Sequence, residues 1–165
     1  MATDFQIRYT VRVLLVDQLD RLLLFQGLDP ANPNSTFWFS VGGGIEEGET
    51  REQAAIREVK EETGLLDFEL GPHVWNREAK YIFDSVKIHA IETWFFSRVK
   101  KFEIDISGFS EIEREFIIKY RWWSPSELST THENLTPRHL STLFKDLLLN
   151  NFPKVPIDLE IEDHT

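Results

Sequence analysis

Residues 43–65 read GGIEEGETREQAAIREVKEETGL, and the rest of the chain is interpreted outward from this stretch. Thr50 and Gln53 have the spacing of a helix N-cap with a capping box, and Gly64 is placed as a C-terminal stop. The stretch therefore predicts a glycine-rich turn followed by a helix of about 13 residues.

Three glutamates of the predicted helix, Glu58, Glu61 and Glu62, share one face because they occupy positions i, i+3 and i+4. An isolated acidic run of this kind usually faces solvent and does nothing more. Because like charges repel at this spacing, the same arrangement also suits a bound cation. The spacing alone leaves both interpretations open.

Two features favour the cation. Ile56 and Val59 lie well round the helix from the glutamates, which gives the helix a separate face to bury. The turn Gly42-Gly43-Gly44 before the helix lets the backbone approach an ion or phosphate closely. Oxygen ligands favour Mg²⁺ or Mn²⁺ over zinc, so a hard divalent cation is expected.

The stretch matches the box of the Nudix family at every defined position: Gly, five residues, Glu, seven residues, then Arg-Glu-apolar-x-Glu-Glu-x-Gly-apolar. The chain thus resembles a Nudix hydrolase, a pyrophosphohydrolase that needs Mg²⁺ or Mn²⁺. The resemblance implies that Glu58, Glu61 and Glu62 bind the metal, with a glycine carbonyl at Gly42 or Gly43 as a further ligand.

The resemblance also implies an ion pair between Glu49 and Arg57 that orients the helix without taking part in the chemistry. One position departs from the pattern, since Val41 stands where family members often have proline before the paired glycines. Valine suits the end of an extended strand, so little change in chemistry is expected.

The general base is the least determined role. Within the box Glu62 is the first choice, and Glu61 is the other catalytic candidate. Some family members use a glutamate outside the box, and here Glu111, Glu113 and Glu115 form the best-placed acidic cluster. That cluster has a competing structural explanation, because Ser110 with Glu113 is also a capping box.

Outside the box, strand-like and helix-like segments alternate. Residues 8–26 and 73–99 predict β-hairpins, and Phe37–Phe39 predicts a strand after a loop at residues 29–36. Helices are expected from Ser124-Pro125 and from Thr136-Pro137. This order predicts an α/β/α sandwich of Nudix type around a mixed β-sheet. The single domain should span residues 1–155, followed by an acidic C-terminal tail at 156–165.

Several side chains could hold the substrate. Trp38, Trp75 and Arg77, together with Gly42, are candidates for stacking on a base or pairing with phosphate. Large aromatics more often pack in a core. The stretches around Trp75-x-Arg77 and Arg121-Trp122-Trp123-Ser124 also resemble bacterial Nudix proteins of unassigned substrate, a weaker resemblance than that of the box.

Composition narrows the partners. The net charge of -10 disfavours binding to long nucleic acids or anionic membranes, so a small nucleotide is the expected partner. The chain has no cysteine and neither a signal peptide nor a membrane-spanning run is recognisable, which suits a cytoplasmic protein. Sheet edges and the aromatic second hairpin could support a homodimer.

The leading hypothesis is hydrolysis of a pyrophosphate bond in a nucleoside diphosphate linked to a group X, such as a nucleoside triphosphate or ADP-ribose. The alternative is a Nudix module that senses nucleotides without turnover. Such modules usually lack box glutamates, which are intact here. A Nudix-fold isomerase acting on isoprenoid diphosphates would call for a catalytic cysteine.

Overall fold

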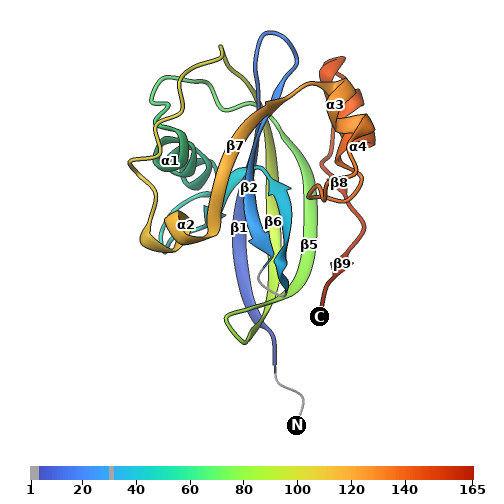
Figure 1. Ribbon diagram of the computed structural model, residues 1–165. Helices are drawn as coiled ribbons and strands as arrows, with labels where there is room; N and C mark the ends of the chain where they lie inside the picture. The colour runs from blue at the N-terminus through green and yellow to red at the C-terminus, as the bar shows by residue number, and fades with distance from the viewer. Residues whose placement is uncertain (1–3, 30–31) are drawn as a thin grey trace.

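The computed structural model describes residues 4–29 and 32–165 and shows a mixed β-sheet with helices on both faces (Figure 1). The strands are β1 (Gln6–Val16), β2 (Leu22–Asp29), β3 (Asn32–Phe39), β4 (Val41–Gly44), β5 (His73–Phe83), β6 (Val86–Arg98), β7 (Ile117–Trp123), β8 (Ile157–Asp158) and β9 (Glu162–Asp163). The helices are α1 (Arg51–Thr63), α2 (Glu111–Phe116), α3 (Pro125–Thr130) and α4 (Leu140–Leu148).

Strand β1 lies at the centre of the sheet. It pairs in parallel with β6 along its whole length, and its other edge is shared by β4, antiparallel at Thr10–Val13, and by β2 at Val16. The first predicted hairpin is therefore confirmed, but its strands diverge after the pair Val16↔Leu22. This divergence makes room for β4, which carries the glycines of the box.

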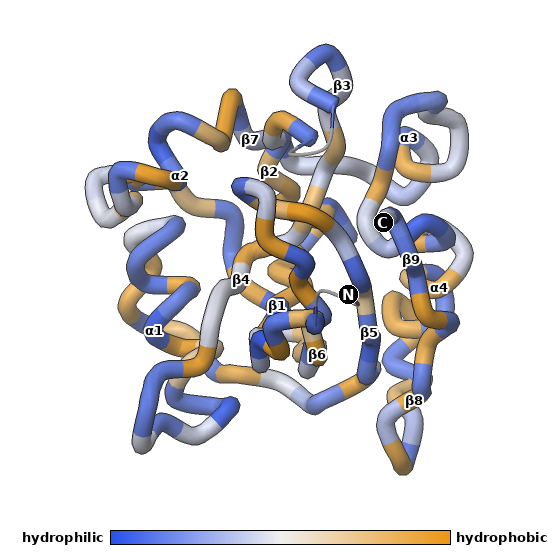
Figure 2. The backbone as a smooth tube through the Cα atoms, turned by 90° about the horizontal axis from the view of Figure 1, so that it is seen from below, coloured by the Kyte–Doolittle hydropathy of each residue, from blue (hydrophilic) through white to orange (hydrophobic). Residues whose placement is uncertain are grey.

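Side chains of β1 alternate between two hydrophobic cores, as expected for a strand covered on both faces. Leu14 and Val16 belong to the core under α3 and α4, whereas Val13 and Leu15 belong to the core under α1. Figures 1 and 2 show α1 and α2 on one side of the sheet and α3 and α4 on the other. The predicted α/β/α sandwich is confirmed.

Local signals placed three helices and one turn correctly. Thr50, Ser110 and Ser124 each cap a helix, and each receives the reciprocal capping-box bond. The second hairpin is also confirmed, and Asp84 and Ser85 take positive φ values of 47° and 63° at its two-residue turn. Polar residues tolerate this conformation better than branched ones, so the turn fixes the register of β5 and β6.

The predicted loop at residues 29–36 was wrong for the part that the structure describes. Residues 32–36 belong to β3, while Pro30 and Ala31 lie outside the described residues. β3 is an edge strand that pairs with β2, and Pro33 lies where the register of this pairing shifts; proline is tolerated at such edges and irregularities because it cannot donate to the ladder. A composition rich in Pro, Asn and Ser predicted a loop, although an edge strand that pairs with one neighbouring strand can tolerate these residues.

The glycines at 42–44 were predicted to form a turn, but they belong to the short strand β4. Gly42 takes φ 153°, and a Cβ there would collide with the Val11 carbonyl oxygen of the neighbouring strand. Glycine is required at this position because β1 and β4 approach so closely.

The last helix begins at Leu140, later than predicted from Thr136-Pro137. The preceding segment runs beside β3 instead: the N–H of Trp38 donates to the Asn134 carbonyl at 2.8 Å, and the N–H of Thr136 donates to the Trp38 carbonyl at 2.9 Å. Leu140, Phe144 and Leu147 are buried, as their helical spacing indicates.

The acidic segment predicted to be a tail pairs with the sheet. β8 and β9 add in parallel to the outer edge of β5, at Trp75–Asn76 and at Ala79–Lys80. In the part of the chain that the structure describes, no helix is long and apolar enough to cross a membrane.

Candidate active site

Helix α1 presents its box glutamates because its opposite face is packed against the sheet. Ala54, Ala55 and Val59 are fully buried over β4 and β1. Ile56, predicted to be part of the buried face, is 46 % exposed. Two small alanines take its place, which allows the helix to lie close to β4.

Two of the three box glutamates face the glycine strand. The Gly42 N–H donates to Glu62 Oε2 at 3.0 Å, and Glu62 is only 3 % exposed. The Glu58 carboxylate lies so close to Gly43 that a Cβ on this glycine would meet it at 2.5 Å. The glycines are therefore needed to admit the carboxylates. The backbone group that contacts a box glutamate is the Gly42 N–H, and the glycine carbonyl expected as a metal ligand stays a prediction.

Arg57 holds the box together as the sequence predicted for the Glu49–Arg57 pair. Its Nε and Nη2 donate to the two oxygens of Glu49 at 2.7 and 3.0 Å, and Nη2 also donates to the Gly44 carbonyl. The bidentate hydrogen bonds from Arg57 lower the pKa of Glu49 to about 2. The loop before α1 is thereby tied to the middle of the helix.

The same guanidinium reaches the metal-ligand candidates. Arg57 Nη1 lies 2.8 Å from Glu58 Oε1 and 3.1 Å from Glu61 Oε2, so it bridges these two carboxylates. Glu61 is the most accessible of the three glutamates, with its side chain 45 % exposed. Arg57 therefore offsets negative charge at the rim of the site, and its hydrogen bonds do not include Glu62.

A fourth carboxylate comes from outside the box. Glu113 of α2 lies close enough to Glu62 to raise its pKa, while the Glu113 Oε1 accepts from the Ser110 N–H in the capping box that the sequence also indicated. Burial raises the pKa of Glu62 well above its usual value, and the contact with Glu113 and the charge of Glu58 raise it further. The surroundings of Glu62 therefore favour its protonated form more than water does.

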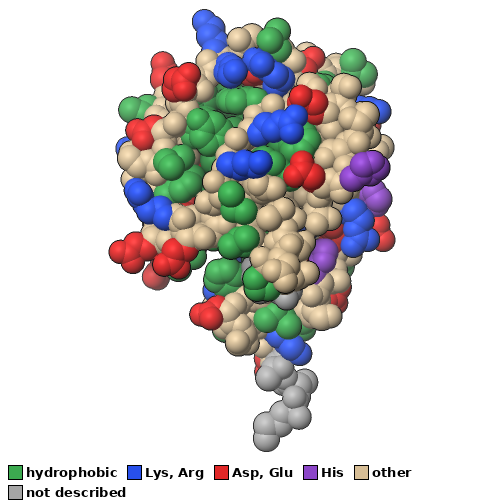
Figure 3. Space-filling view, in the orientation of Figure 1, with side chains coloured by type: hydrophobic (Ala, Val, Ile, Leu, Met, Phe, Trp, Pro, Cys, Tyr) green, Lys and Arg blue, Asp and Glu red, His purple; other side chains and the backbone are tan. Residues whose placement is uncertain are grey.

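The other members of the predicted acidic cluster point elsewhere. Glu111 and Glu115 are exposed, and Figure 3 shows acidic side chains gathered over α2 at the surface. Glu111 and Glu115 are each two residues away from Glu113. Helix geometry therefore places their side chains on a different face of α2 from the one that faces Glu62. Of the three candidates, the structure brings Glu113 alone to the box carboxylates.

The chemistry of these donors fits a hard divalent cation. Glu58, Glu61, Glu62 and Glu113 supply oxygen ligands only, and burial and the neighbouring glutamates raise the pKa of Glu58 against the opposing effect of Arg57. Within residues 4–29 and 32–165, no three acidic or imidazole side chains are already gathered tightly enough to hold an ion. The carboxylates would therefore have to draw closer together to share an ion.

The predicted substrate-binding side chains lie elsewhere. Trp38 and Trp75 are each 1 % exposed and pack in the core under α3 and α4, on the far side of the sheet from α1. Arg77 is 4 % exposed, and its Nη1 and Nη2 lie 2.9 Å from Glu92 and 2.7 Å from Glu162. Of the predicted set, Gly42 is the one that contacts a box glutamate.

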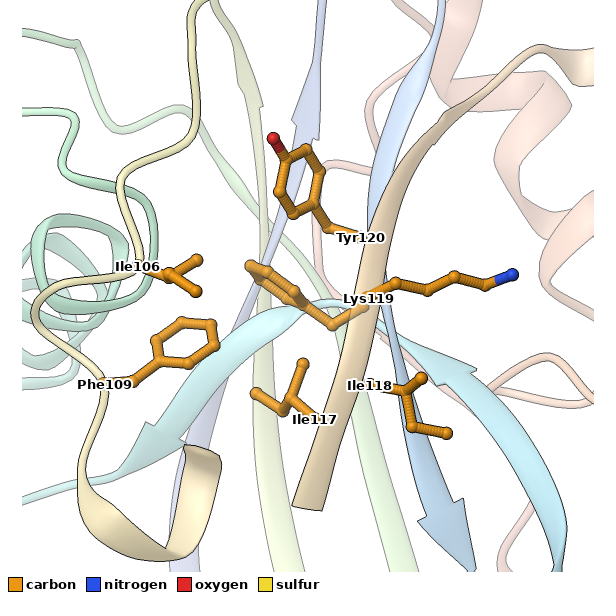
Figure 4. Close-up of a pocket in the computed structure, with 7 residues that line it drawn as sticks. Ile106, Phe109, Ile117, Ile118, Lys119 and Tyr120 are labelled. Atoms are coloured by element: carbon orange, nitrogen blue, oxygen red, sulfur yellow. The ribbon is translucent and has the colours of Figure 1, made fainter. Parts of the chain in front are cut away.

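Two cavities flank the sheet. An apolar pocket of about 50 Å³ lies between β7 and the loop before α2, lined by Phe109, Ile117 and Tyr120 among others (Figure 4). A cavity of about 440 Å³ lies between α4 and β5, where Trp75 and Leu147 line it. Neither of these two cavities is lined by a box carboxylate, and the first is too small for a nucleobase.

One cation near the carboxylates escaped the sequence interpretation. Arg12 of β1 lies close enough to Glu62 to lower its pKa, partly opposing the effect of burial. An arginine at a half-buried position between valines of β1 was the available signal, because a charged residue in such a place calls for a partner.

Comparison with known proteins agrees with this geometry. The chain is 33 % identical over 98 residues to the dihydroneopterin triphosphate diphosphatase of Escherichia coli K12, an alignment covering 50 % of this chain and 59 % of that protein. Less than two thirds of that relative is therefore matched.

Solved structures share the fold. A MutT protein from Methanosarcina mazei Go1 is similar with a TM-score of 0.63 and 19 % identity, over 90 % of this chain and 97 % of that one. The E. coli dihydroneopterin triphosphate pyrophosphohydrolase is similar with a TM-score of 0.60 and 24 % identity, over 86 % and 95 %. The NUDIX domain family matches residues 6–145. The chain belongs to the Nudix family.

Proposed function

We propose that this chain is a divalent-metal-dependent pyrophosphohydrolase that cleaves a nucleoside diphosphate linked to a group X by attack of water on phosphorus. The observation that carries the proposal is the buried carboxylate of Glu62, which Arg57 does not hydrogen-bond and which lies close to Glu58 and Glu113. A purely structural cluster of this kind would be costly, since each buried carboxylate has to be neutralised or paired.

The residues divide the work by position. Glu58, Glu61 and Glu62 would hold Mg²⁺ or Mn²⁺, which when bound neutralises phosphate oxygens and lowers the pKa of the attacking water. Arg57 and Glu49 keep α1 and the glycine strand in register. Glu62 or Glu113 would accept the proton from water, because these two carboxylates lie near each other beside the glutamates that would hold the metal.

The substrate class rests on the relatives. The matched E. coli protein is described as a dihydroneopterin triphosphate diphosphatase, so a pterin triphosphate joins the nucleoside triphosphates and ADP-ribose as a candidate. A non-catalytic nucleotide-sensing module remains the second candidate function. The intact box glutamates favour the hydrolase.

A substrate panel tests the proposal. With Mg²⁺, the protein should cleave at least one compound among nucleoside triphosphates, ADP-ribose and dihydroneopterin triphosphate, measured as phosphate released after addition of a phosphatase. Excess EDTA should abolish turnover, and added Mg²⁺ or Mn²⁺ should restore it. Tight binding of a panel member without turnover, by protein with an intact circular dichroism spectrum, would favour the sensing module instead.

Replacing Glu113 tests whether the base lies outside the box. Glu113→Gln keeps the capping box with Ser110 but cannot take up the proton, so we expect kcat to fall by roughly 100-fold with little change in stability. Glu115→Gln, on the same helix with an exposed side chain, is the matched control and should retain wild-type kcat. Equal activity of the two variants would assign the base to Glu62.

A further inference from the structure

Arg12 is a cation whose hydrogen-bonding capacity is largely unused. Its Nη1 donates to the Ser40 carbonyl at a long 3.3 Å, and its Nε lies 4.0 Å from Glu92 Oε1. A guanidinium has five N–H donors, so most of those of Arg12 are uncommitted to the described residues. The side chain is 22 % exposed and can therefore be reached from solvent.

Two neighbouring arginines show the contrast. Arg57 is engaged by Glu49, Glu58, Glu61 and a glycine carbonyl, as described above. Arg77 has both Glu92 and Glu162 within 3 Å, so its charge is satisfied inside the sheet. Arg77 Nη1 and Trp94 Nε1 both donate to Glu92 Oε2, and the other oxygen, Oε1, lies 4.0 Å from Arg12 Nε, which is too far for a hydrogen bond.

Arg12 and Glu62 meet at the same glycine. Glu62 accepts from the Gly42 N–H, and a Cβ on Gly42 would lie 2.9 Å from Arg12 Cδ. Because Gly42 has no side chain, β4 leaves room at this position for the side chain of Arg12. The fold thus brings a guanidinium with free hydrogen-bond donors to the edge of the carboxylate site.

A second observation points to a missing polar partner on the same strand. Thr10 lies two residues before Arg12 on the same face of β1, and it is 7 % exposed. Its hydroxyl is buried without a hydrogen-bond partner among the described residues. Buried hydroxyls are normally satisfied, so a bound group or its water shell would complete this end of the strand.

We infer that Arg12 binds a phosphate group of the diphosphate substrate, on the β1 side of the box carboxylates. The inference rests on the proposed hydrolase function for the identity of the ligand. A diphosphate brings two or more negative charges into a protein of net charge -10, and the carboxylates that hold the metal would repel it. A guanidinium with free donors matches phosphate geometry, and Lys would supply a charge without the planar fork.

Binding of a non-hydrolysable diphosphate separates this inference from turnover. Imidodiphosphate with Mg²⁺ is titrated into wild-type protein, Arg12→Ala, Arg12→Lys and Arg98→Ala, and the dissociation constants are measured by isothermal titration calorimetry. Arg12→Ala should weaken binding about 10- to 100-fold, because a charge-assisted hydrogen bond is lost, and Arg12→Lys should fall in between. Arg98, which pairs with Asp20 at the first hairpin, is the control and should bind like wild type.

The outcomes are distinct. Arg12-dependent binding of imidodiphosphate by a protein that turns over no panel compound would support the inference and sink the proposed hydrolase. Turnover with an active substrate should show a raised KM and a smaller change in kcat for Arg12→Ala. Equal affinity of wild type and Arg12→Ala, or no binding by wild type, would overturn the inference. If Arg12→Ala lowers the melting temperature sharply, Arg12→Lys carries the comparison.

Discussion

Glu62→Gln should lower kcat by about 10³-fold while the protein stays folded, since the change would remove a proposed metal ligand and a proposed proton acceptor at once. Glutamine keeps the side-chain oxygen that accepts from the Gly42 N–H, so the local backbone is preserved. Steady-state kinetics on whichever panel compound is cleaved measures the loss. Near-normal turnover would transfer the catalytic role to Glu61 or Glu113.

The same variant should be more stable than wild type without metal. A carboxyl whose pKa is raised by folding contributes full stability below its usual pKa and loses it as the pH rises through the folded value. As the pH rises above the usual pKa of a glutamate, wild-type protein therefore loses stability that Glu62→Gln keeps. Thermal melts in EDTA should show a higher melting temperature for the variant, and the difference should shrink or reverse in Mg²⁺ because only wild type binds the ion well.

The same substitution at an exposed glutamate of α1 provides the control. Glu52 lies in the first turn of α1 with an exposed side chain, so Glu52→Gln removes one charge without touching the site. Its kcat and its response to Mg²⁺ should both match wild type. A stability gain in Glu52→Gln as large as in Glu62→Gln would mean that net charge, and not burial of Glu62, sets the metal-free stability.

Glu92→Leu should cost about 3–5 kcal/mol of unfolding free energy, because it leaves the buried Arg77 with one of its two carboxylates. Glu92 and Glu162 raise the pKa of Arg77, although burial alone would lower it. The change also orphans the Trp94 Nε1–H, which donates to Glu92 at 2.9 Å. For a chain of this length the melting temperature should fall by roughly 10 °C.

Two variants show whether charge is the cause. Glu78→Ala removes a partly exposed carboxylate of β5 that pairs with His89, and it should change the unfolding free energy by less than about 1 kcal/mol. The double variant Arg77→Met with Glu92→Leu should recover much of the loss, since no buried charge is then left unpaired. Additive losses in urea unfolding would show that packing volume, and not the ion pair, sets the cost.

Much of the fold was predictable because its signals are local. The caps of α1, α2 and α3 and the turn at Asp84-Ser85 depend on residues within a few positions of each other. The strands at residues 32–36 and 42–44 were missed, since a strand rich in Pro, Asn or Gly forms only when a distant partner fixes it.

The candidate site divides in the same way. The spacing of Glu58, Glu61 and Glu62 and the Glu49–Arg57 pair follow from one helix and its leading loop. Glu113 is separated from the box by two long strands, and only the tertiary fold decides that it, and not its two neighbours, reaches Glu62. Trp38 and Trp75 could not be separated from core residues by sequence, because aromatic side chains serve both purposes.

The pairing of β8 and β9 along β5 also bears on how the protein behaves at high concentration. A long aromatic strand with open N–H and C=O groups is a template for another chain, and proteins that leave such an edge bare risk edge-to-edge aggregation. Here the acidic segment occupies that edge at two places and surrounds it with carboxylates, and Glu162 fastens it to Arg77. By covering this edge, the segment opposes edge-to-edge association of the protein and so favours its colloidal stability.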